Sequence, residues 1–280
     1  MKVLKDFEAY LQKRKYARAT VMNYTKHVDY FLDWTQQQGI LPTQVRYADL
    51  LLFLQYCQKQ GQSRNHQRQH TTALRHLFGM LRRRHKMNYN PAEGLFVGRR
   101  AKRLPHDLLP MDELRTLYES YSGSVRRKLL LGLVVFQAIR REELGKLRIE
   151  HLHLKEGKVI VPATPSSNRR VLKLSTEQII PFHEWTAGKR PGDRLFLSPQ
   201  GSRSLNNVIQ QLLYQLRQLN PDVKHLQQIR QSVIAHWLKS HDVRRVQYMA
   251  GHKWVSSTER YQQTDLEDLQ HKLDKYHPLG

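Results

Sequence analysis

The chain has 280 residues, with 47 Lys and Arg against 24 Asp and Glu, which gives a formal net charge of +23. This length is typical of about two domains, and 39% hydrophobic residues can build real cores, which argues against a disordered chain. The longest apolar stretch, 129–139, is about half the length of a membrane span, and the single cysteine, Cys57, excludes an internal disulfide framework and a multi-cysteine metal site.

The first part of the chain shows apolar side chains at the three- and four-residue spacing of α-helices. Helices are predicted around residues 3–11, 21–32, 50–57 and 70–81. Four helices around one core form a small all-α bundle, which we assign to residues 1–93. Residues 94–110 are predicted to be a basic linker, because glycines and prolines bracket a dense run of Lys and Arg there.

The second domain is predicted to span residues 111–280, including a helical C-terminal tail. Helices are predicted at 111–121 and 125–139, and again at 206–219, 226–240, 243–250 and 257–261. Between these two groups the pattern changes to alternation, with strands at 158–162 and 169–174 around a turn at 164–168, which predicts a β-hairpin. The fold class is therefore mainly α with a small antiparallel sheet.

The excess of positive charge makes a polyanion the expected partner, because Lys and Arg release condensed counterions when they neutralise phosphates. Residues 1–105 carry 20 Lys and Arg and only 6 Asp and Glu, so the N-terminal part is the more basic per residue. DNA or RNA fits better than a membrane surface, since no long amphipathic anchor is visible. A solvated basic face without a specific ligand is the simpler alternative.

Several familiar cofactor motifs are missing from the sequence. It contains neither a Gly-rich phosphate loop of the GxxxxGK[ST] kind nor an HExxH pair. His66 and His70 lie four residues apart, but the sequence offers no third ligand close by, and the same holds for His151 and His153. We therefore predict no metal and no cofactor.

Three segments carry a specific resemblance. Gln137–Leu147, with the sequence QAIRREELGKL, resembles the first arginine box of the tyrosine recombinase (phage integrase) family. Gln227–Leu238 resembles its second arginine box. Val246–His252, followed by Tyr261 nine residues after the histidine, resembles its Leu-Gly-His segment and nucleophilic tyrosine. The three segments occur in the family's order and at its spacing.

The resemblance implies a SAM-like, helical core-binding domain, which fits the N-terminal bundle, and a mixed α+β catalytic domain. It implies that Tyr261 attacks a DNA phosphodiester and forms a covalent 3′-phosphotyrosine. Arg140 and Arg230 would clamp the phosphoryl oxygens, since planar guanidinium groups match their geometry and charge. His252 would donate a hydrogen bond to the same phosphate. The expected enzyme is a site-specific recombinase that needs neither metal nor ATP and integrates or excises a mobile element.

Each of these residues also has a structural interpretation when it is taken alone. Arg140 would serve as a helix cap, Arg230 as the partner of Asp222 or Glu143, and Tyr261 as core packing. Their joint order favours the catalytic interpretation.

Two positions depart from the family pattern. Gln227 stands where the family usually has histidine, and an amide can donate a hydrogen bond but cannot shuttle a proton. Pro165 stands where the family has the hairpin lysine that protonates the leaving 5′ oxygen. Lys158 and Lys173, on the flanking strands, are the substitutes expected from the sequence. A catalytically impaired, recombinase-like DNA-binding protein is therefore the alternative.

The expected partner is double-stranded DNA with specific recombination sites. The free protein would be a monomer or weak oligomer and would form a tetramer on paired sites. Basic residues in three runs are the candidates for DNA binding: Arg82, Arg83, Arg84, Arg99, Arg100, Lys102, Arg103, Arg169 and Arg170. No signal peptide is visible, so we expect a cytoplasmic, nucleoid-associated protein of a bacterial or phage-like host.

Three rival functions share part of this evidence. A non-catalytic DNA-binding protein would have no use for Tyr261. A metal-dependent nuclease needs clustered carboxylates, which the sequence does not show. A relaxing topoisomerase would use the same tyrosine chemistry without paired sites.

Overall fold

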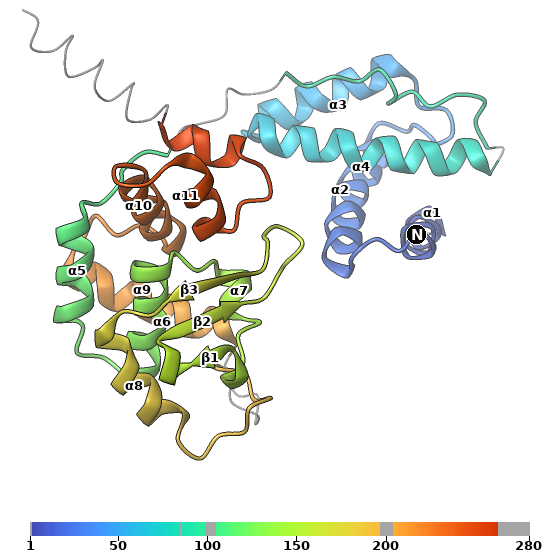
Figure 1. Cartoon of the computed structure of the whole chain (residues 1–280). Helices are drawn as coiled ribbons and strands as arrows, with labels where there is room; N and C mark the ends of the chain where they lie inside the picture. The colour runs from blue at the N-terminus through green and yellow to red at the C-terminus, as the bar shows by residue number, and fades with distance from the viewer. Residues whose placement is uncertain (1, 85, 99–104, 197–203, 263–280) are drawn as a thin grey trace, which may run out of the picture. The chain divides into compact units, whose positions relative to one another are not determined.

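The computed structural model describes residues 2–84, 86–98, 105–196 and 204–262. The chain divides into two compact units, residues 1–102 and 103–280, which are described separately below. Both are built mainly of α-helices, and the second contains one small antiparallel sheet, as the sequence predicts (Figure 1). Within the described ranges, no helix is both long and apolar enough to cross a bilayer.

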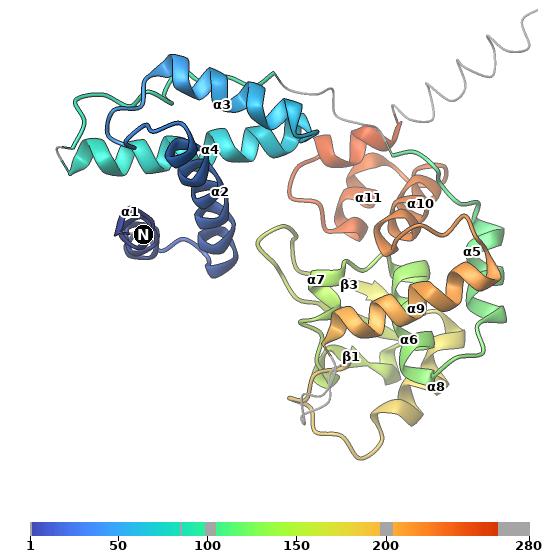
Figure 2. The same ribbon diagram turned by 180° about the vertical axis from the view of Figure 1, so that it is seen from behind.

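The first unit contains four helices, α1 (Lys2–Lys13), α2 (Arg18–Gln37), α3 (Tyr47–Lys59) and α4 (Arg64–Arg83). Helix α4 packs against the other three, and Figures 1 and 2 show α3 running alongside it. The apolar stripes predicted from the sequence form the core, in which Phe31, Phe53 and Phe78 lie fully buried with their rings edge to face.

The predicted linker packs at both of its described ends. Leu95 is fully buried in the first unit, and Arg75 donates hydrogen bonds to the carbonyls of Ala92 and Leu95. At the other end, Leu109 is buried in the second unit and its N–H donates to Ser232 Oγ at 2.8 Å. The stretch between them, residues 99–104, lies outside the described residues.

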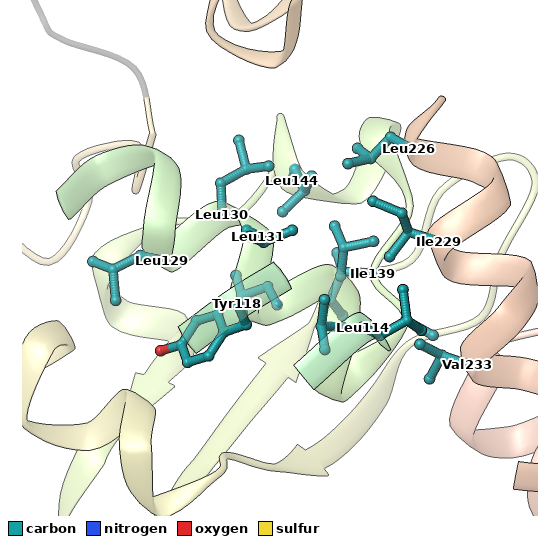
Figure 3. Close-up of a cluster of buried hydrophobic side chains, with 14 of the residues drawn as sticks. Leu114, Tyr118, Leu129, Leu130, Leu131, Ile139, Leu144, Leu226, Ile229 and Val233 are labelled. Atoms are coloured by element: carbon teal, nitrogen blue, oxygen red, sulfur yellow. The ribbon is translucent and has the colours of Figure 1, made fainter. Parts of the chain in front are cut away.

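The second unit is built around α6 (Val125–Gln137), which packs against helices on several sides. Its neighbours are α5 (Met111–Ser120), α8 (Thr176–Thr186), α9 (Leu205–Leu219) and α10 (Leu226–Leu238). Figure 3 shows Leu226, Ile229 and Val233 of α10 directed toward the leucines of α6. Helix α8 was not predicted, because Pro181 lies inside it and normally interrupts a helical pattern.

Short elements complete this unit. They are α7 (Arg141–Leu144), α11 (Val243–Ala250), two 3₁₀ turns at Ile149–His151 and Leu154–Glu156, and a helical stretch at 256–262. The sheet has the order β1 (Leu152–His153), β2 (Lys158–Val161), β3 (Arg170–Lys173), and all pairs are antiparallel. Strands β2 and β3 form the predicted hairpin, with Val161 opposite Arg170 next to the turn and Lys158 opposite Lys173 at the far end.

Candidate active site

The site is assembled around a buried ion pair between Glu143 of α7 and Arg170 of β3. Two hydrogen bonds of 2.7 and 2.9 Å join the guanidinium to the carboxylate, and neither side chain is exposed. Arg170 also donates from Nε to the carbonyl of Met249 at 2.8 Å. Burial alone would raise the pKa of Glu143, but Arg170 holds that pKa below its usual value. The pair thus ties α7, the hairpin and α11 together.

Glu143 also fixes the backbone of Arg140. The Arg140 N–H donates to Glu143 Oε2 at 2.8 Å, so the carboxylate caps the first turn of α7. The side chain of Arg140 is half-buried, and its Nε is shielded from solvent without a hydrogen-bond partner among the described residues. A buried donor of this kind costs free energy unless a ligand satisfies it.

Arg230 lies in α10 and is 1% exposed. It donates from Nη1 to the carbonyl of Ala138 and from Nη2 to the carbonyl of Ala250, the latter at 2.7 Å. Ala138 reaches this position in the left-handed conformation, with φ +48°, at the end of α6. Burial, followed by the nearby charge of Arg140, lowers the pKa of Arg230 to about 9, so the group is still a cation at pH 7.

His252 follows a tight turn at Gly251 and is 4% exposed. Its Nδ1 lies 2.8 Å from Thr258 Oγ1, and its Nε2 lies 3.4 Å from Arg230 Nη2. Burial, followed by the charges of Arg230 and Arg140, lowers the pKa of His252 to about 3. The imidazole is therefore neutral at physiological pH.

Tyr261 lies in the helical stretch 256–262 and is 6% exposed. Its ring is stacked on that of His252, with centroids 6.2 Å apart and planes inclined by 19°. Burial raises the pKa of the phenol, while the charges of Arg230 and Arg140 and a hydrogen bond with Gln231 act in the opposite direction. The four predicted site residues thus meet in one electrostatically coupled cluster.

A cavity of about 280 Å³ opens beside the two arginines. Arg140, Arg230 and the exposed Gln227 all line it. His225, close to Gln227 in sequence, lines the same cavity and caps α10 by accepting the N–H of Gln228 at 2.9 Å. Two guanidinium groups in a concave site are suited to bind a phosphate.

The hairpin turn reaches the edge of this cluster. Ser167 is fully buried and forms an isolated β-bridge with His252, and the N–H of Asn168 donates to the carbonyl of Gly251 at 3.1 Å. Lys158 and Lys173, however, lie at the opposite end of the hairpin, and Lys158 Nζ is 3.1 Å from a carboxylate oxygen of Glu156. The structure does not bring the two predicted substitute lysines to the site.

A different lysine, which was not predicted from the sequence, places its ammonium group against the hairpin turn. Lys146 is exposed just after α7, and its Nζ donates to the carbonyl of Ala163 at 3.1 Å. Its only signal in the sequence is its place inside the first arginine box.

The predicted DNA-binding residues have mixed outcomes. Arg170 is 2% exposed and paired with Glu143, so its prediction as a DNA contact is wrong: its charge is already satisfied inside the protein. Arg169 is exposed. Arg83 is exposed, whereas Arg82 and Arg84 face Glu93 and Asp6 at 3.6 and 2.8 Å across the surface of the first unit. Arg99, Arg100, Lys102 and Arg103 lie outside the described residues.

Comparison with known proteins agrees with this geometry. The model of the phage integrase family matches residues 107–267, and that of the phage integrase N-terminal SAM-like domain matches residues 4–85. The chain therefore belongs to the phage integrase family, the class that also contains the tyrosine recombinases.

Similar individual proteins cover nearly the whole chain. Tyrosine recombinase XerC of Shigella dysenteriae is 28% identical over 288 residues, covering 98% of this chain and 96% of the relative. In fold, the chain is similar to a lambda integrase (residues 75–356) dimer bound to a COC′ core site, with a TM-score of 0.70, 14% identity, and coverage of 93% of this chain and 94% of the other. The chain is also similar in fold to the Tn1549 transposon integrase in complex with circular intermediate DNA. The TM-score is 0.70 and the sequence identity 13%, and the match covers 92% of this chain and 94% of the other.

Proposed function

We propose that the protein is a site-specific DNA recombinase that breaks and rejoins DNA through a covalent 3′-phosphotyrosine. One observation carries the proposal: Arg140, Arg230, His252 and Tyr261, predicted separately from three segments of the sequence, lie together in one positively charged cluster in which Arg140 is half-buried and the other three are buried. An uncompensated excess of cations inside a protein is costly unless the site is built for an anionic ligand.

In this mechanism the phenolic oxygen of Tyr261 attacks the scissile phosphorus, and the bond from phosphorus to the 5′ oxygen breaks. Arg140 and Arg230 stabilise the negative charge that spreads over the phosphoryl oxygens, which is the role that metal ions fill in many nucleases. The same charges favour the phenolate of Tyr261. Because the phosphoester is kept as a protein–DNA bond, a 5′ hydroxyl can reseal it without ATP.

His252 is proposed to donate from Nε2 to a phosphoryl oxygen. In the structure Nε2 faces Arg230 Nη2, which can only donate. This role therefore requires Arg230 to turn that N–H to the phosphate and His252 to take the tautomer in which Nδ1 accepts from the hydroxyl of Thr258. Gln227, which lines the cavity beside Arg230, is proposed to donate its amide N–H to the same phosphate.

Lys146 is proposed to donate the proton that the leaving 5′ oxygen takes up. Its ammonium is held at the turn of the hairpin, and residues of the same turn contact the His252 segment. Lys158 and Lys173 are separated from that turn by the length of the strands. An ammonium on a flexible stem can reach a bound phosphate and give up a proton as negative charge builds on the leaving oxygen.

The finer parts of the proposal concern the substrate and the assembly. Four protomers on two DNA sites would exchange strands, and the setting would be the integration or excision of a mobile element inside a cell. Membership of the phage integrase family fits this setting and equally fits a chromosomal role of the XerC kind. Inverted or direct repeats beside the gene, with a circular junction carrying them, would support it further, whereas a gene without such repeats would overturn it.

The enzymatic part is tested with a nicked duplex that contains a candidate site from the DNA flanking the gene. We expect a covalent protein–DNA adduct in the presence of EDTA, measured at a temperature at which circular dichroism shows that the protein is folded. Dependence on added Mg²⁺ would favour the nuclease, and relaxation of supercoils lacking paired sites would favour the topoisomerase.

The alternative function is a catalytically impaired, DNA-binding relative. It is favoured by Pro165 and Gln227 at two positions where the family usually has proton-transferring residues. Sequence-specific DNA binding without an adduct would establish it.

A further inference from the structure

Three histidines meet in the first unit, which contributes none of the residues of the candidate active site. His66 and His70 lie one turn apart on α4, and His27 of α2, 43 residues before His70, faces them. The ring centroids are 4.4 to 5.1 Å apart, and one ligand nitrogen from each residue lies within 4.8 Å of the other two. The third ligand that the sequence analysis found missing is thus supplied by the packing of α2 against α4.

The hydrogen bonds of the two buried members identify which of their nitrogens carry protons. His27 Nε2 lies 3.0 Å from Gln69 Oε1, and His70 Nε2 lies 3.0 Å from Gln62 Oε1. An amide oxygen only accepts hydrogen bonds, so both Nε2 atoms donate, and in a neutral imidazole the lone pair is then on Nδ1. Gln62 also forms a hydrogen bond with the hydroxyl of Tyr30, which helps to fix the orientation of its amide.

The two Nδ1 lone pairs therefore face each other. The atoms are 3.3 Å apart. His70 Nδ1 also lies 3.3 Å from the carbonyl oxygen of His27, which accepts a hydrogen bond when the proton of His70 is on Nδ1 and which loses that bond when Nδ1 binds a metal. Both imidazoles are buried, with 2% and 1% exposed, so water cannot separate the lone pairs easily. Such a juxtaposition of acceptors is unfavourable unless a cation binds between them.

The geometry matches a zinc site. Two nitrogens bound tetrahedrally at the usual zinc–nitrogen length of about 2.0–2.1 Å lie about 3.3 Å apart. Donation of the second ring nitrogen to an amide or carbonyl oxygen is the usual way in which proteins orient zinc-binding histidines. His66 is exposed, so its side chain can rotate to complete a three-histidine set, with water at the fourth position.

We propose that His27, His66 and His70 bind one divalent transition-metal ion of the zinc type, which crosslinks α2 to α4. This proposal departs from the sequence-based prediction of no metal. Imidazole-only ligand sets select ions of this type over Mg²⁺ and Ca²⁺, which prefer oxygen. The ion has a structural role and is separate from the DNA chemistry, since its ligands belong to the other compact unit.

The test uses the untagged full-length chain, stripped with a chelator and titrated with Zn²⁺. We expect one tightly bound equivalent, a rise in the melting temperature, and, after Co²⁺ is substituted, the visible absorption of a four-coordinate cobalt centre. His66→Gln removes an exposed ligand without disturbing the core and should abolish the cobalt bands and the rise in melting temperature. His183→Gln, at an exposed histidine of α8, is the matched control and should change neither.

A second variant tests the orientation of the imidazoles. Gln62→Leu removes the acceptor of His70 Nε2 and should weaken zinc binding by roughly 10–100-fold. The proposal is overturned if the wild type binds no more zinc than His66→Gln. It is equally overturned if ¹⁵N NMR finds a proton on His70 Nδ1 that zinc does not displace.

Discussion

Arg170 and Glu143 form a two-pronged ion pair, at 2.7 and 2.9 Å, from which solvent is fully excluded. The pair joins the β-hairpin to the short helix that begins next to Arg140, and Arg170 also holds the carbonyl of Met249, close to His252. The carboxylate thus sets the position of the cluster without contacting the phosphate, which it would repel.

Removing the charge of Glu143 should destabilise the protein strongly. Glu143→Gln leaves the Arg170 guanidinium buried without a counter-charge, and a broken buried pair costs about 3–5 kcal/mol. Urea unfolding of the full chain measures this. A loss below about 1 kcal/mol would show that the pair does not organise the unit.

Gly251→Ala should displace Arg170. A Cβ at Gly251 would lie 2.4 Å from Arg170 Nη1, and the backbone has φ +67°. The matched control is Gly188→Ala, where φ is +73° and no atom lies within 4 Å of the added carbon. In both variants an alanine in the left-handed conformation lowers the free energy of unfolding. Overpacking against Arg170 should lower it by about 1–3 kcal/mol more in Gly251→Ala. Equal melting temperatures for the two variants would contradict this contact.

The neutral His252 should make the protein sensitive to acid. Its pKa is lowered to about 3 in the folded chain from an ordinary value of 6.5. Between these two pH values His252 binds a proton in the unfolded state but not in the folded state. Stability attributable to this residue is present above pH 6.5 and is lost as the pH falls, by at most ~1.4 kcal/mol per pH unit.

Comparison with His252→Gln isolates this effect. The difference in unfolding free energy between wild type and variant should shrink steadily from pH 7 to pH 5. A difference that stays constant with pH would mean that His252 is not held neutral by burial and the neighbouring arginines.

Lys146 is expected to protonate the leaving 5′ oxygen. Lys146→Met should slow cleavage of an ordinary phosphodiester by about 10²–10⁴-fold. A substrate with sulfur in place of the bridging 5′ oxygen needs no general acid, so it should restore the rate, which a merely structural defect would not allow. Lys158→Met and Lys173→Met are the controls and should leave both rates nearly unchanged. A defect that sulfur fails to rescue would remove Lys146 from this role.

The sequence predicted those parts of the fold that depend on local pattern. The helices of the first unit and the hairpin follow from periodicities of three to four and of two residues, and Arg140, Arg230, His252 and Tyr261 follow from ordered motifs. Pairings between distant segments were not predictable. Arg170 looked like a surface cation because its partner lies 27 residues earlier, on α7.

The same limit explains the other differences. Lys158 and Lys173 are close to the turn in sequence, but the register of the hairpin places them opposite each other at its far end. Helix α8 was missed because Pro181, which usually marks the end of a helix, lies within it.

The most direct test of the account is to identify the atom that becomes joined to DNA. A nicked substrate traps the intermediate, and digestion followed by mass spectrometry locates the attached nucleotide. We predict attachment to Tyr261, no adduct with Tyr261→Phe, and duplex binding by that variant within a few-fold of the wild type. An adduct that persists in Tyr261→Phe, or one that maps to another residue, would contradict the account.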